Sequence, residues 1–535
     1  MSRPVSAGYP ADVVVAGGGL GGCAAALAAL RNGRRVVMTE ETDWIGGQLT
    51  QQGVPPDEHQ WIETHGAPQS YRDLRTAIRQ YYLDHYPVTA AARQQVHFNP
   101  GSGAVSRLCH EPRVALAALQ NLFAPYLSNR QLTLLLHHRI TGADTDGDRV
   151  RGLTATDVRT QNSVTLTAPY FVDATELGDL LPLTGTEYVT GTESQAETGE
   201  LHAPERADLT NQQAFTMCLA MDYVPDSKNL IDKPKDYNFW RTFVPDLTPD
   251  WPGRLLSLTY THPSTLQPKT LGFDPRGGAT GEVLNLWNYR RVIAQDNFTP
   301  GTYAGDVTGV NWPQNDYFLG NLVDVSPEEA QQHVEQSKQL SLSLFYWLQT
   351  EAPRPDGGQG WPGLRLRGDV LGTADGLAKY PYVRESRRIR AQFTVLEEHV
   401  GKEQRAMVAG AGATAATFAD SVGVGYYHID LHPSSGGDNY IDFASLPFQI
   451  PLGALLPQRV QNLLPANKNI GTTHITNGCY RLHPVEWSIG EAVGLLTSFA
   501  MDRKTTPHAV REDAGLLAEF QRWIGKQGIE TQWKE

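Results

Sequence analysis

Cysteine is scarce in this sequence, and it is spread too widely to form a metal site or a disulfide framework. The four cysteines among 535 residues form no CxxC pair: they are Cys23, Cys109, Cys218 and Cys479. Closely spaced cysteines are the usual signature of zinc sites and of small disulfide-bonded domains. We therefore expect no metal ion, and a protein that works in a reducing cytoplasm.

Long hydrophobic runs and basic clusters are missing as well. The one long run of small apolar residues, Ala16 to Leu30, is too short to span a bilayer. Near the N-terminus Arg3 stands alone, without the hydrophobic segment and cleavage site of an export signal. A formal net charge of −13 repels phosphate backbones. We expect a small-molecule substrate as the partner, and neither a membrane nor a nucleic acid.

A strand, a glycine-rich turn and a helix follow one another near the start of the chain. The run DVVVA, residues 12–16, has the composition of a strand buried on both faces. Gly17, Gly19 and Gly22 then form a GxGxxG pattern, and the alanine-rich segment behind them ends at Gly33 as a helix would. Such glycines let the backbone approach a pyrophosphate at the helix N-terminus, where free N–H groups attract anions. The order predicts a dinucleotide-binding βαβ unit.

An acidic residue stands where such a unit needs one. Glu40 ends the second predicted strand, RRVVMTE, and its carboxylate would accept hydrogen bonds from ribose hydroxyls. The same charge would repel a 2′-phosphate. From these residues alone, NAD and FAD both remain open.

The segment behind Glu40 resembles that of flavoproteins. It reads ETDWIGGQLTQQG and contains Gly46, Gly47 and Gln48. With this segment the chain resembles the FAD-dependent oxidoreductases that are related to the fumarate reductase and glutathione reductase flavoprotein fold. The resemblance implies noncovalent FAD, with the Gly-Gly turn and Gln48 beside the pyrophosphate and the flavin.

Two later segments extend the resemblance. LTLLLHHRI and PYFVDATELGDLL, with a polar meander between them, are similar to the family's third strand, β-excursion and returning strand. Thr175, Gly178 and Asp179 match the ATxxGD-like end of the returning strand, which implies cofactor contacts for Thr175 and Gly178. Ile140 falls where the family uses backbone groups against adenine.

The C-terminal part resembles the family in the same order along the chain. The matching segments are residues 380–389, 420–433, 448–464 and 469–500. Relatives commonly read Ala-Gly-Arg where this chain has Lys-Asn-Ile-Gly, so no arginine is assigned at that point. The resemblance covers nearly the whole chain.

A helix is predicted to begin at Pro484, since proline suits the first turn. One apolar face recurs at helical spacing in Val485, Ile489, Ala492, Val493 and Leu496. The resemblance implies that the N-terminus of this helix points at the pyrimidine edge of the flavin. There it would stabilise the negative charge that develops on reduction. It also implies cofactor binding by Glu486 and Gly490.

Candidate catalytic residues gather just before this helix. His474, Arg481 and His483 fall within ten residues, and the family positions matching His474 and Arg481 lie on the substrate side. Arginine would clamp a carboxylate or polarise a carbonyl, and either histidine would serve as a base at neutral pH. The alternative is that the histidines cap the helix or satisfy buried backbone groups.

The middle of the chain differs in composition. Between Thr186 and Asp375, proline, asparagine, aspartate and aromatic residues become frequent, and six of the eleven tryptophans occur there. Frequent prolines favour short strands and loops. The exception is a helix predicted from Ser326, Pro327 and Glu329, which form its cap and first turn, to about residue 348.

A chain of this length exceeds the size at which one hydrophobic core usually keeps growing. We expect an α/β fold, with a Rossmann-type, glutathione-reductase-like FAD domain built from noncontiguous segments and an inserted mixed α+β domain. Residues 1–185 and 376–505 would form the two parts of the FAD domain, 186–375 the substrate or cap domain, and 506–535 a helical tail.

A mixed charged segment is interpreted as surface. Arg384, Arg387 and Arg388 alternate with Glu385 in a helix-like stretch, which favours a solvated face with ion pairs.

Two further motifs are interpreted as structural. Gly410, Gly412 and Ala415 form a GxGxxA pattern, but only AMV precedes it as a strand, so we expect a connection rather than a second site for NADH. Cys109 and His110 are adjacent in sequence, which points their side chains apart and argues against a catalytic pair.

These observations predict an FAD-dependent oxidoreductase that moves a hydride between a small polar substrate and flavin N5. Oxidation at an alcohol or amine carbon and reduction of an activated double bond both remain open. The alternatives are a flavin-binding protein with a structural or redox-sensing role, or a flavin reductase that uses NAD(P)H.

Overall fold

The computed structural model describes residues 6–278 and 280–534. Residues 1–5, where part of the export-signal expectation falls, lie outside the described residues. Among the described residues, no helix is long and apolar enough to cross a bilayer, and no cluster of three or more His, Cys, Asp or Glu is placed to hold a metal ion. The four cysteines are free and buried.

A five-stranded parallel sheet forms the centre of the cofactor-binding part. Its strands are β2 (Val13–Ala16), β3 (Val36–Glu40), β4 (Leu132–Leu136), β8 (Tyr170–Asp173) and β23 (Leu463–Pro465). Their order in space is β23, β8, β2, β3, β4, so a strand from the C-terminal part completes a sheet begun at the N-terminus. This arrangement confirms the expected α/β fold with a Rossmann-type domain made from noncontiguous segments.

The glycine-rich turn connects β2 to helix α1 (Leu20–Arg31), which ends just before Gly33 as predicted. Gly17 has a φ of +94°, and a Cβ added there would lie 2.3 Å from the carbonyl oxygen of Ala174. Only glycine fits that backbone conformation and that close approach to the end of β8. The turn thereby brings the α1 N-terminus next to two strand ends.

A second sheet takes three of its four strands from the segment between β4 and β8, as the predicted β-excursion requires, and the fourth, β1, from the start of the described chain. Its four strands are β1 (Ser6–Pro10), β7 (Ser163–Thr167), β6 (Arg149–Asp157) and β5 (His138–Asp146), in that spatial order. Apolar residues of this sheet and of the parallel sheet share a separate small core. The excursion therefore packs against the cofactor domain.

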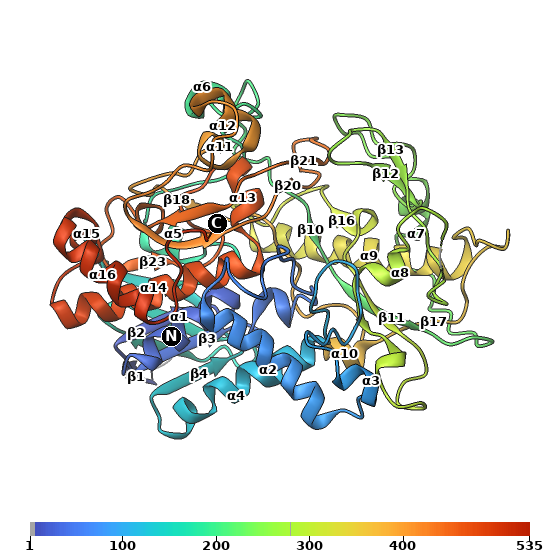
Figure 1. Ribbon diagram of the computed structural model, residues 1–535, viewed down its shortest axis with the longest axis horizontal. Helices are drawn as coiled ribbons and strands as arrows, with labels where there is room; N and C mark the ends of the chain where they lie inside the picture. The colour runs from blue at the N-terminus through green and yellow to red at the C-terminus, as the bar shows by residue number, and fades with distance from the viewer. Residues whose placement is uncertain (1–5, 279, 535) are drawn as a thin grey trace.

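Helix α14 (His483–Arg503) lies directly against α1 (Figure 1). A Cβ added at Gly490 would lie 2.0 Å from the carbonyl oxygen of Gly21, and one added at Gly494 would lie 2.2 Å from that of Ala25. The two backbones therefore touch where they cross. The predicted helix is confirmed, with its first residue at His483. The C-terminal part of the chain forms helices α15 (Pro507–Glu512) and α16 (Ala514–Lys526).

The middle of the chain builds a second hydrophobic core, on the right in Figure 1. It contains an antiparallel sheet with the order β14 (Arg291–Ile293), β15 (Val307–Val310), β11 (Leu219–Tyr223), β17 (Leu364–Leu366). Helix α9 (Pro327–Thr350) packs on it, and Ser326 caps the helix as predicted. All six tryptophans of the region are buried in this core: Trp240, Trp251, Trp287, Trp312, Trp347 and Trp361. Val54, Tyr382, Val383 and Tyr440, from outside residues 186–375, join them.

Further helices and paired strands complete the described structure. The helices are α2 (Gln69–His85), α3 (Ala90–Arg93), α4 (Pro112–Ser128), α5 (Leu180–Thr184), α6 (Gln195–Thr198), α7 (Tyr237–Thr242), α8 (Leu286–Tyr289), α10 (Gly368–Leu371), α11 (Glu397–Val400), α12 (Lys402–Ala409) and α13 (His474–Tyr480). The paired strands are β9 (Tyr188–Val189) with β18 (Arg388–Ile389), β10 (Phe215–Thr216) with β16 (Asp316–Tyr317), β12 (Thr259–Thr261) with β13 (Pro268–Thr270), β19 (Ser421–Gly425) with β22 (Phe448–Pro451), and β20 (Ile429–Leu431) with β21 (Ile441–Phe443).

Gly490→Ala tests the helix crossing. The added Cβ forces α14 away from α1, and such overpacking costs about 1–3 kcal/mol. We expect a lower melting temperature in thermal unfolding. The matched control is Gly525→Ala in α16, where nothing lies within 4 Å of the added Cβ and alanine favours the helix by about 0.5–1 kcal/mol. Equal melting temperatures of the two variants would contradict the crossing.

Glu491→Gln tests a buried carboxyl on α14. Burial raises the pKa of Glu491 to about 7, although the Ser70 hydroxyl that donates to it acts in the opposite direction. A raised pKa stabilises the fold at low pH, and this contribution is lost as the pH rises toward 7. Between pH 5 and pH 8 the free energy of unfolding of the wild type should fall by on the order of 1 kcal/mol or more, whereas that of Glu491→Gln should not show this fall. Parallel melting temperatures of the two proteins at both pH values would refute this assignment.

Candidate functional site

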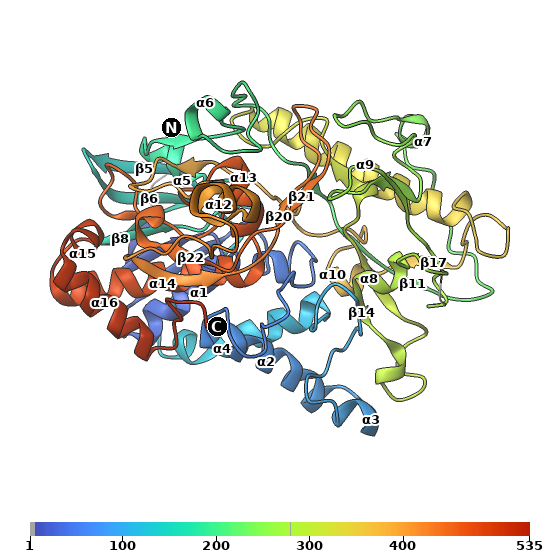
Figure 2. The ribbon, with the colours of Figure 1, turned by 45° about the horizontal axis from the view of Figure 1, so that its top comes forward.

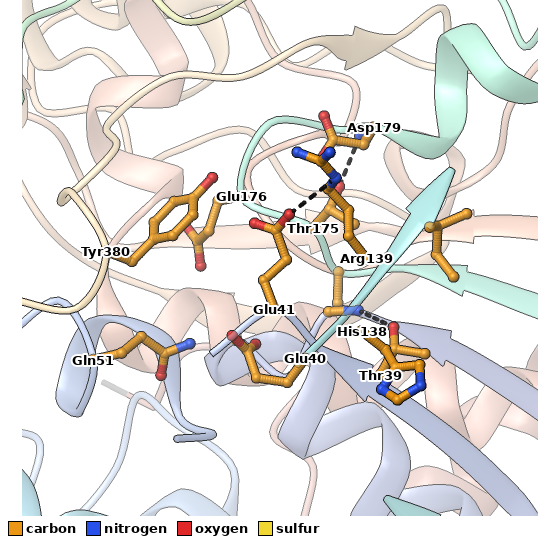
Figure 3. Close-up of a pocket in the computed structure, with 14 residues that line it drawn as sticks. Thr39, Glu40, Glu41, Gln51, His138, Arg139, Thr175, Glu176, Asp179 and Tyr380 are labelled. Atoms are coloured by element: carbon orange, nitrogen blue, oxygen red, sulfur yellow. Dashed lines mark hydrogen bonds and ion pairs between the residues drawn. The ribbon is translucent and has the colours of Figure 1, made fainter. Parts of the chain in front are cut away.

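The carboxyl ends of β2, β3 and β8 meet at one edge of the parallel sheet, and a pocket opens there (Figure 3). Open parallel sheets bind ligands beyond this edge. Five residues predicted from the sequence line the pocket: Gly17, Gly19, Glu40, Ile140 and Thr175. Glu41, Gln51, His138, Arg139, Glu176 and Tyr380 also line it and were missed. The pocket lies where the predicted dinucleotide would bind.

Glu40 sits at the end of β3 and already accepts several hydrogen bonds. The Gly18 N–H donates to Oε2 at 3.0 Å, and the N–H and hydroxyl of Thr42 donate to Oε1 at 2.9 and 3.0 Å. Burial raises the pKa of Glu40 to about 7 despite the bonds from Thr42. Ribose hydroxyls would supply further donors to this buried carboxyl, as the sequence predicts.

The α1 N-terminus is open to a ligand. Its N-cap is Gly19, which lines the pocket and has no side chain to accept from the N–H groups of the first turn, although the Gly21 N–H already donates to Glu486. The Gly46 N–H donates to the Gly18 carbonyl at 2.7 Å, and a Cβ on Gly47 would lie 2.9 Å from Leu20 N. The predicted Gly-Gly turn therefore packs against the glycine-rich turn.

Other predicted cofactor residues hold the site together instead of lining the pocket. A Cβ on Gly22 would lie 2.1 Å from the Gly17 carbonyl oxygen, so this glycine lets α1 pack on β2. Gly490 does the same between α14 and α1. Gly178 has a φ of +67° and lies against Arg387. The Glu486 carboxylate accepts from the Gly21 N–H at 3.0 Å and from the Gln48 amide.

Buried polar atoms near the Gly-Gly turn and the α14 N-terminus lack hydrogen-bond partners within the described chain. They are Gln48 Oε1, both side-chain polar atoms of Gln52, and His483 Nε2. Buried polar atoms in proteins are nearly always paired, so this group marks a ligand with donors and acceptors. The residues present fit FAD: Glu40 would hold the ribose, the α1 N-terminus the pyrophosphate, and the Gln48 region the flavin. When bound, FAD supplies the chemistry of a two-electron hydride acceptor.

A second cavity of about 280 Å³ lies between the second core and the β20–β21 hairpin. In both ribbon views this hairpin stands between α13 and α9 (Figure 2). The ionic side chains of the cavity are Asp57, Arg290, Arg384, Asp430, Asp442 and Arg481, together with His262, His428 and His432. Its aromatic side chains are Tyr260, Tyr289, Trp312, Tyr382, Tyr427 and Tyr440. Of the predicted catalytic residues, only Arg481 lines this cavity.

Arg481 connects the second cavity to the cofactor segment. Its backbone carbonyl accepts from the Gln48 amide at 3.0 Å, while its guanidinium donates to the Tyr382 hydroxyl at 2.8 Å and to Asp430 Oδ2 at 2.9 Å. The segment from Tyr380 to Tyr382 makes the same connection, because Tyr380 lines the first pocket and Tyr382 the second cavity. The two sites are therefore neighbours.

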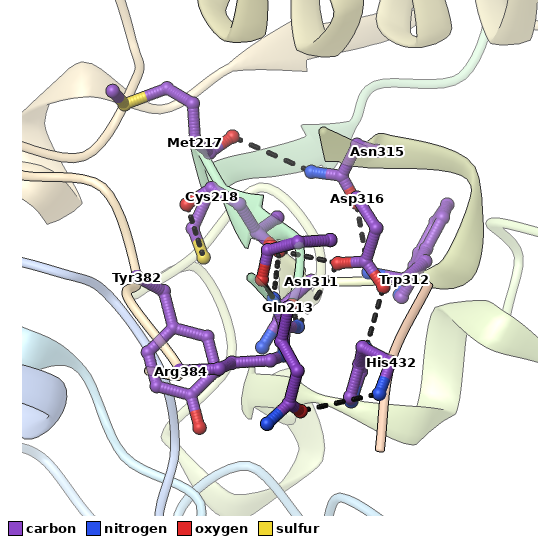
Figure 4. A network of polar contacts seen from close by, with 12 residues as sticks. Gln213, Met217, Cys218, Asn311, Trp312, Asn315, Asp316, Tyr382, Arg384 and His432 are labelled. Carbon is purple, nitrogen blue, oxygen red and sulfur yellow. Dashed lines mark hydrogen bonds and ion pairs between the residues drawn. The ribbon is translucent and has the colours of Figure 1, made fainter. Parts of the chain in front are cut away.

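His432 lies between two carboxylates at the cavity wall, and Figure 4 shows its contact with one of them, Asp316. Its Nδ1 lies 2.6 Å from Asp316 Oδ2, and its Nε2 lies 3.2 Å from Asp430 Oδ2. Burial alone would raise the pKa of Asp316, but Arg384 and His432 lower it to about 2. This polar network was missed because its members come from three distant segments of the chain, around residues 316, 384 and 430–432.

His474 and His483 lie elsewhere. His474 begins α13, and its Nδ1 lies 2.9 Å from the buried Glu385. His483 accepts a hydrogen bond from the Asp57 N–H at 3.1 Å, and burial lowers the pKa of His483 to about 4. His483 is therefore neutral at physiological pH.

The predicted solvated arginine face is wrong. Arg384 and Arg388 are fully buried, and the segment is extended rather than helical. Arg384 is paired with Asp316 at 3.0 Å, Arg388 with Glu193 at 2.8 Å and with Glu385, and Arg387 with Asp324 at 2.8 Å. These partners lie far away in sequence, except Glu385, and they supply the compensation that buried charges require.

The GxGxxA segment is a connection, as expected. However, the AMV that was interpreted as its strand belongs to helix α12, and no helix follows Gly412. Gly410 and Gly412 are exposed, with nothing within 4 Å of an added Cβ. The arrangement of a dinucleotide-binding unit is missing from this part of the described chain.

Comparison with known proteins supports the cofactor assignment. The sequence model of the family described as FAD dependent oxidoreductase matches residues 12–524, nearly the whole chain. No curated protein matches the sequence.

Likenesses to solved structures are remote. The flavoprotein FrdA of E. coli quinol fumarate reductase is 12% identical over 97% of this chain and 74% of its own, with a TM-score of 0.33. The FAD complex of glycerol-3-phosphate dehydrogenase from Bacillus halodurans is 15% identical over 40% of each chain, with a TM-score of 0.24. L-proline dehydrogenase from P. horikoshii is 14% identical over 36% of this chain, with a TM-score of 0.19, and only 25% of its own length is matched.

Gly19→Val tests the cofactor pocket. The valine side chain would occupy the approach to the α1 N-terminus, so we expect the purified variant to lose FAD. The control is Gly412→Val, the same substitution in the other glycine motif, which should retain FAD. Flavin released by denaturation and identified by chromatography measures both. Stoichiometric FAD in folded Gly19→Val would overturn the assignment of this pocket.

Proposed function

Because the chain belongs to the family of FAD dependent oxidoreductases, we propose that it transfers a hydride between a small polar substrate in the second cavity and flavin N5. The observation that carries this proposal is the position of Arg481, whose backbone binds Gln48 on the cofactor side while its guanidinium lines the cavity. A substrate in contact with this side chain would lie beside the cofactor segment.

In this proposal Arg481 binds and orients the substrate. Its Nη1 donates to Tyr382 and its Nη2 to Asp430, so the guanidinium has one fixed orientation. Charge-assisted bonds of a fixed guanidinium position a polar group well. Hydride transfer needs such positioning, since the reacting carbon must be held close to the acceptor atom.

Proton transfer must accompany the hydride when an alcohol or amine is oxidised. Asp442 is suited to accept this proton, because burial raises its pKa to about 6 while His428 acts in the opposite direction. A group with a pKa near the working pH is the most effective general base. We assign His474 and His483 a positioning part, since neither is among the residues that line the cavity.

The middle of the chain, residues 186–375, would act as the substrate domain, since it supplies Tyr260, Tyr289 and Trp312 to the cavity. A cytoplasmic location fits the free, buried cysteines, because disulfides are typical of oxidising compartments.

Arg481→Ala tests the proposal. The bond from Gln48 reaches the Arg481 backbone and survives the substitution, so FAD should stay bound. Loss of the guanidinium should weaken substrate-driven flavin reduction by about tenfold to a hundredfold, the equivalent of roughly 1.5–3 kcal/mol for bonds to a charged group. Anaerobic stopped-flow bleaching of the flavin measures this effect.

The matched control is Arg459→Ala, because Arg459 is a half-exposed arginine on the surface, paired with Glu187. This variant should reduce its flavin at the wild-type rate. If Arg481→Ala and Arg459→Ala both behave like the wild type, the second cavity is not the substrate site.

A further inference from the structure

The charges of the second cavity are paired within the protein, and this feature bears on the substrate class. Every guanidinium group of the cavity has a carboxylate partner. The pairs are Arg290–Asp57 at 3.2 Å, Arg384–Asp316 at 3.0 Å and Arg481–Asp430 at 2.9 Å. A substrate carboxylate would have to displace one of these aspartates. Breaking a buried ion pair is strongly unfavourable, because one charge is left uncompensated.

The accessible ionic groups are acceptors rather than guanidinium donors. The Asp430 and Asp442 side chains are each 19% exposed and that of His428 is 42% exposed, whereas the three guanidinium side chains are at most 9% exposed. Ionised carboxylates accept hydrogen bonds only, and phenols and imidazoles both donate and accept. Hydroxyl groups, which donate and accept, match such a wall.

Cation–π contacts to a ligand are restricted in this cavity. Two of the tyrosine faces are already covered by protein cations: Arg290 lies 5.1 Å from the Tyr289 ring and Arg384 lies 4.8 Å from the Tyr382 ring. These two ring faces are therefore occupied and cannot make a cation–π contact with a ligand.

The size and shape of the second cavity also bear on the substrate class. A volume of about 280 Å³ equals that of roughly nine water molecules at about 30 Å³ each. Tyr260 and Tyr440, with ring centroids 6.0 Å apart, provide flat apolar surface next to Asp430 and Asp442. Flat rings beside oriented polar groups suit a molecule whose carbon skeleton is apolar and whose edge carries hydroxyls.

We propose that the substrate is an uncharged polyhydroxylated molecule of monosaccharide size, oxidised at one of its alcohols. This inference rests on the proposed function. In the half-reaction the carbinol C–H bond breaks and its hydride passes to FAD, the O–H bond loses its proton to a cavity carboxylate or imidazole, and a carbonyl forms. Two electrons leave the substrate and FAD takes both.

The test is anaerobic flavin reduction of the FAD-loaded enzyme by three compound classes. Neutral probes are common hexoses, pentoses, sorbitol and myo-inositol, anionic probes are 2-hydroxy acids and uronic acids, and charged nitrogen compounds are amino acids and choline. We expect bleaching by at least one neutral compound, with a rate that changes less than about twofold between low and high salt, because screening does not act on an uncharged ligand. Bleaching by anionic or nitrogen compounds alone overturns the substrate class and leaves the proposed function standing. Failure of every class, with dithionite still reducing the flavin, overturns both.

A charge-matched pair sharpens the test. A sugar that bleaches the flavin should do so at least tenfold more efficiently than its uronic acid, which differs by one carboxylate. Asp442→Asn removes one accessible negative charge together with the proposed base, so both reduction rates should fall while their ratio narrows severalfold. A wild-type enzyme that prefers the uronic acid would contradict the proposal, as would an unchanged ratio in Asp442→Asn.

Discussion

The close crossing of α14 over α1 is the contact on which the site depends. The two helices are separated by more than 450 residues, yet Gly490 and Gly494 let α14 lie directly on the backbone of Gly21 and Ala25. A larger residue at either glycine would hold the helices apart. Since Arg481 lies just before α14 and His483 is its first residue, the crossing also fixes where these residues lie relative to the glycine-rich turn. The hydrogen bonds from Gln48 to Arg481 and from Asp57 to His483 join the segment behind the glycine-rich turn to the same end of α14.

Buried ion pairs are the second constraint, and they define the cavity more than they stabilise the fold. A buried pair of opposite charges gains little net free energy, because desolvation offsets most of the attraction. Removing one partner is costly, however, so each pair fixes the relative positions of its two segments. The pair of Arg384 with Asp316 joins the segment around residue 384 to β16. The pair of Arg481 with Asp430 joins the start of α14 to the β20–β21 hairpin. The cavity wall is held by residues from both cores.

Local patterns predicted residues of the first pocket, whereas long-range pairing determined the second cavity. The strand, the GxGxxG turn, Glu40 and the capped helix α9 follow from residues within about thirty positions of one another, so their sequence suffices. Arg384 and Arg388 were misinterpreted because arginine near glutamate at helical spacing usually marks a solvated face. Their burial depends on Asp316 and Glu193, which no local pattern reveals. One signal was readable: His428, Asp430 and His432 alternate along β20 and the residues that flank it, and side chains two residues apart in a strand share a face.

A neutral histidine, His483, also connects the two sites. Burial lowers the pKa of His483 to about 4, so this ring stays neutral between the Asp57 loop and the start of α14. A protonated His483 would add a positive charge next to the Arg290–Asp57 pair and would compete with Arg290 for the aspartate. Because His483 accepts the Asp57 N–H at Nδ1, its proton lies on Nε2, the buried atom without a partner. The histidine thus contributes a neutral donor beside the cofactor segment, and the cavity keeps its pairing of positive and negative charges.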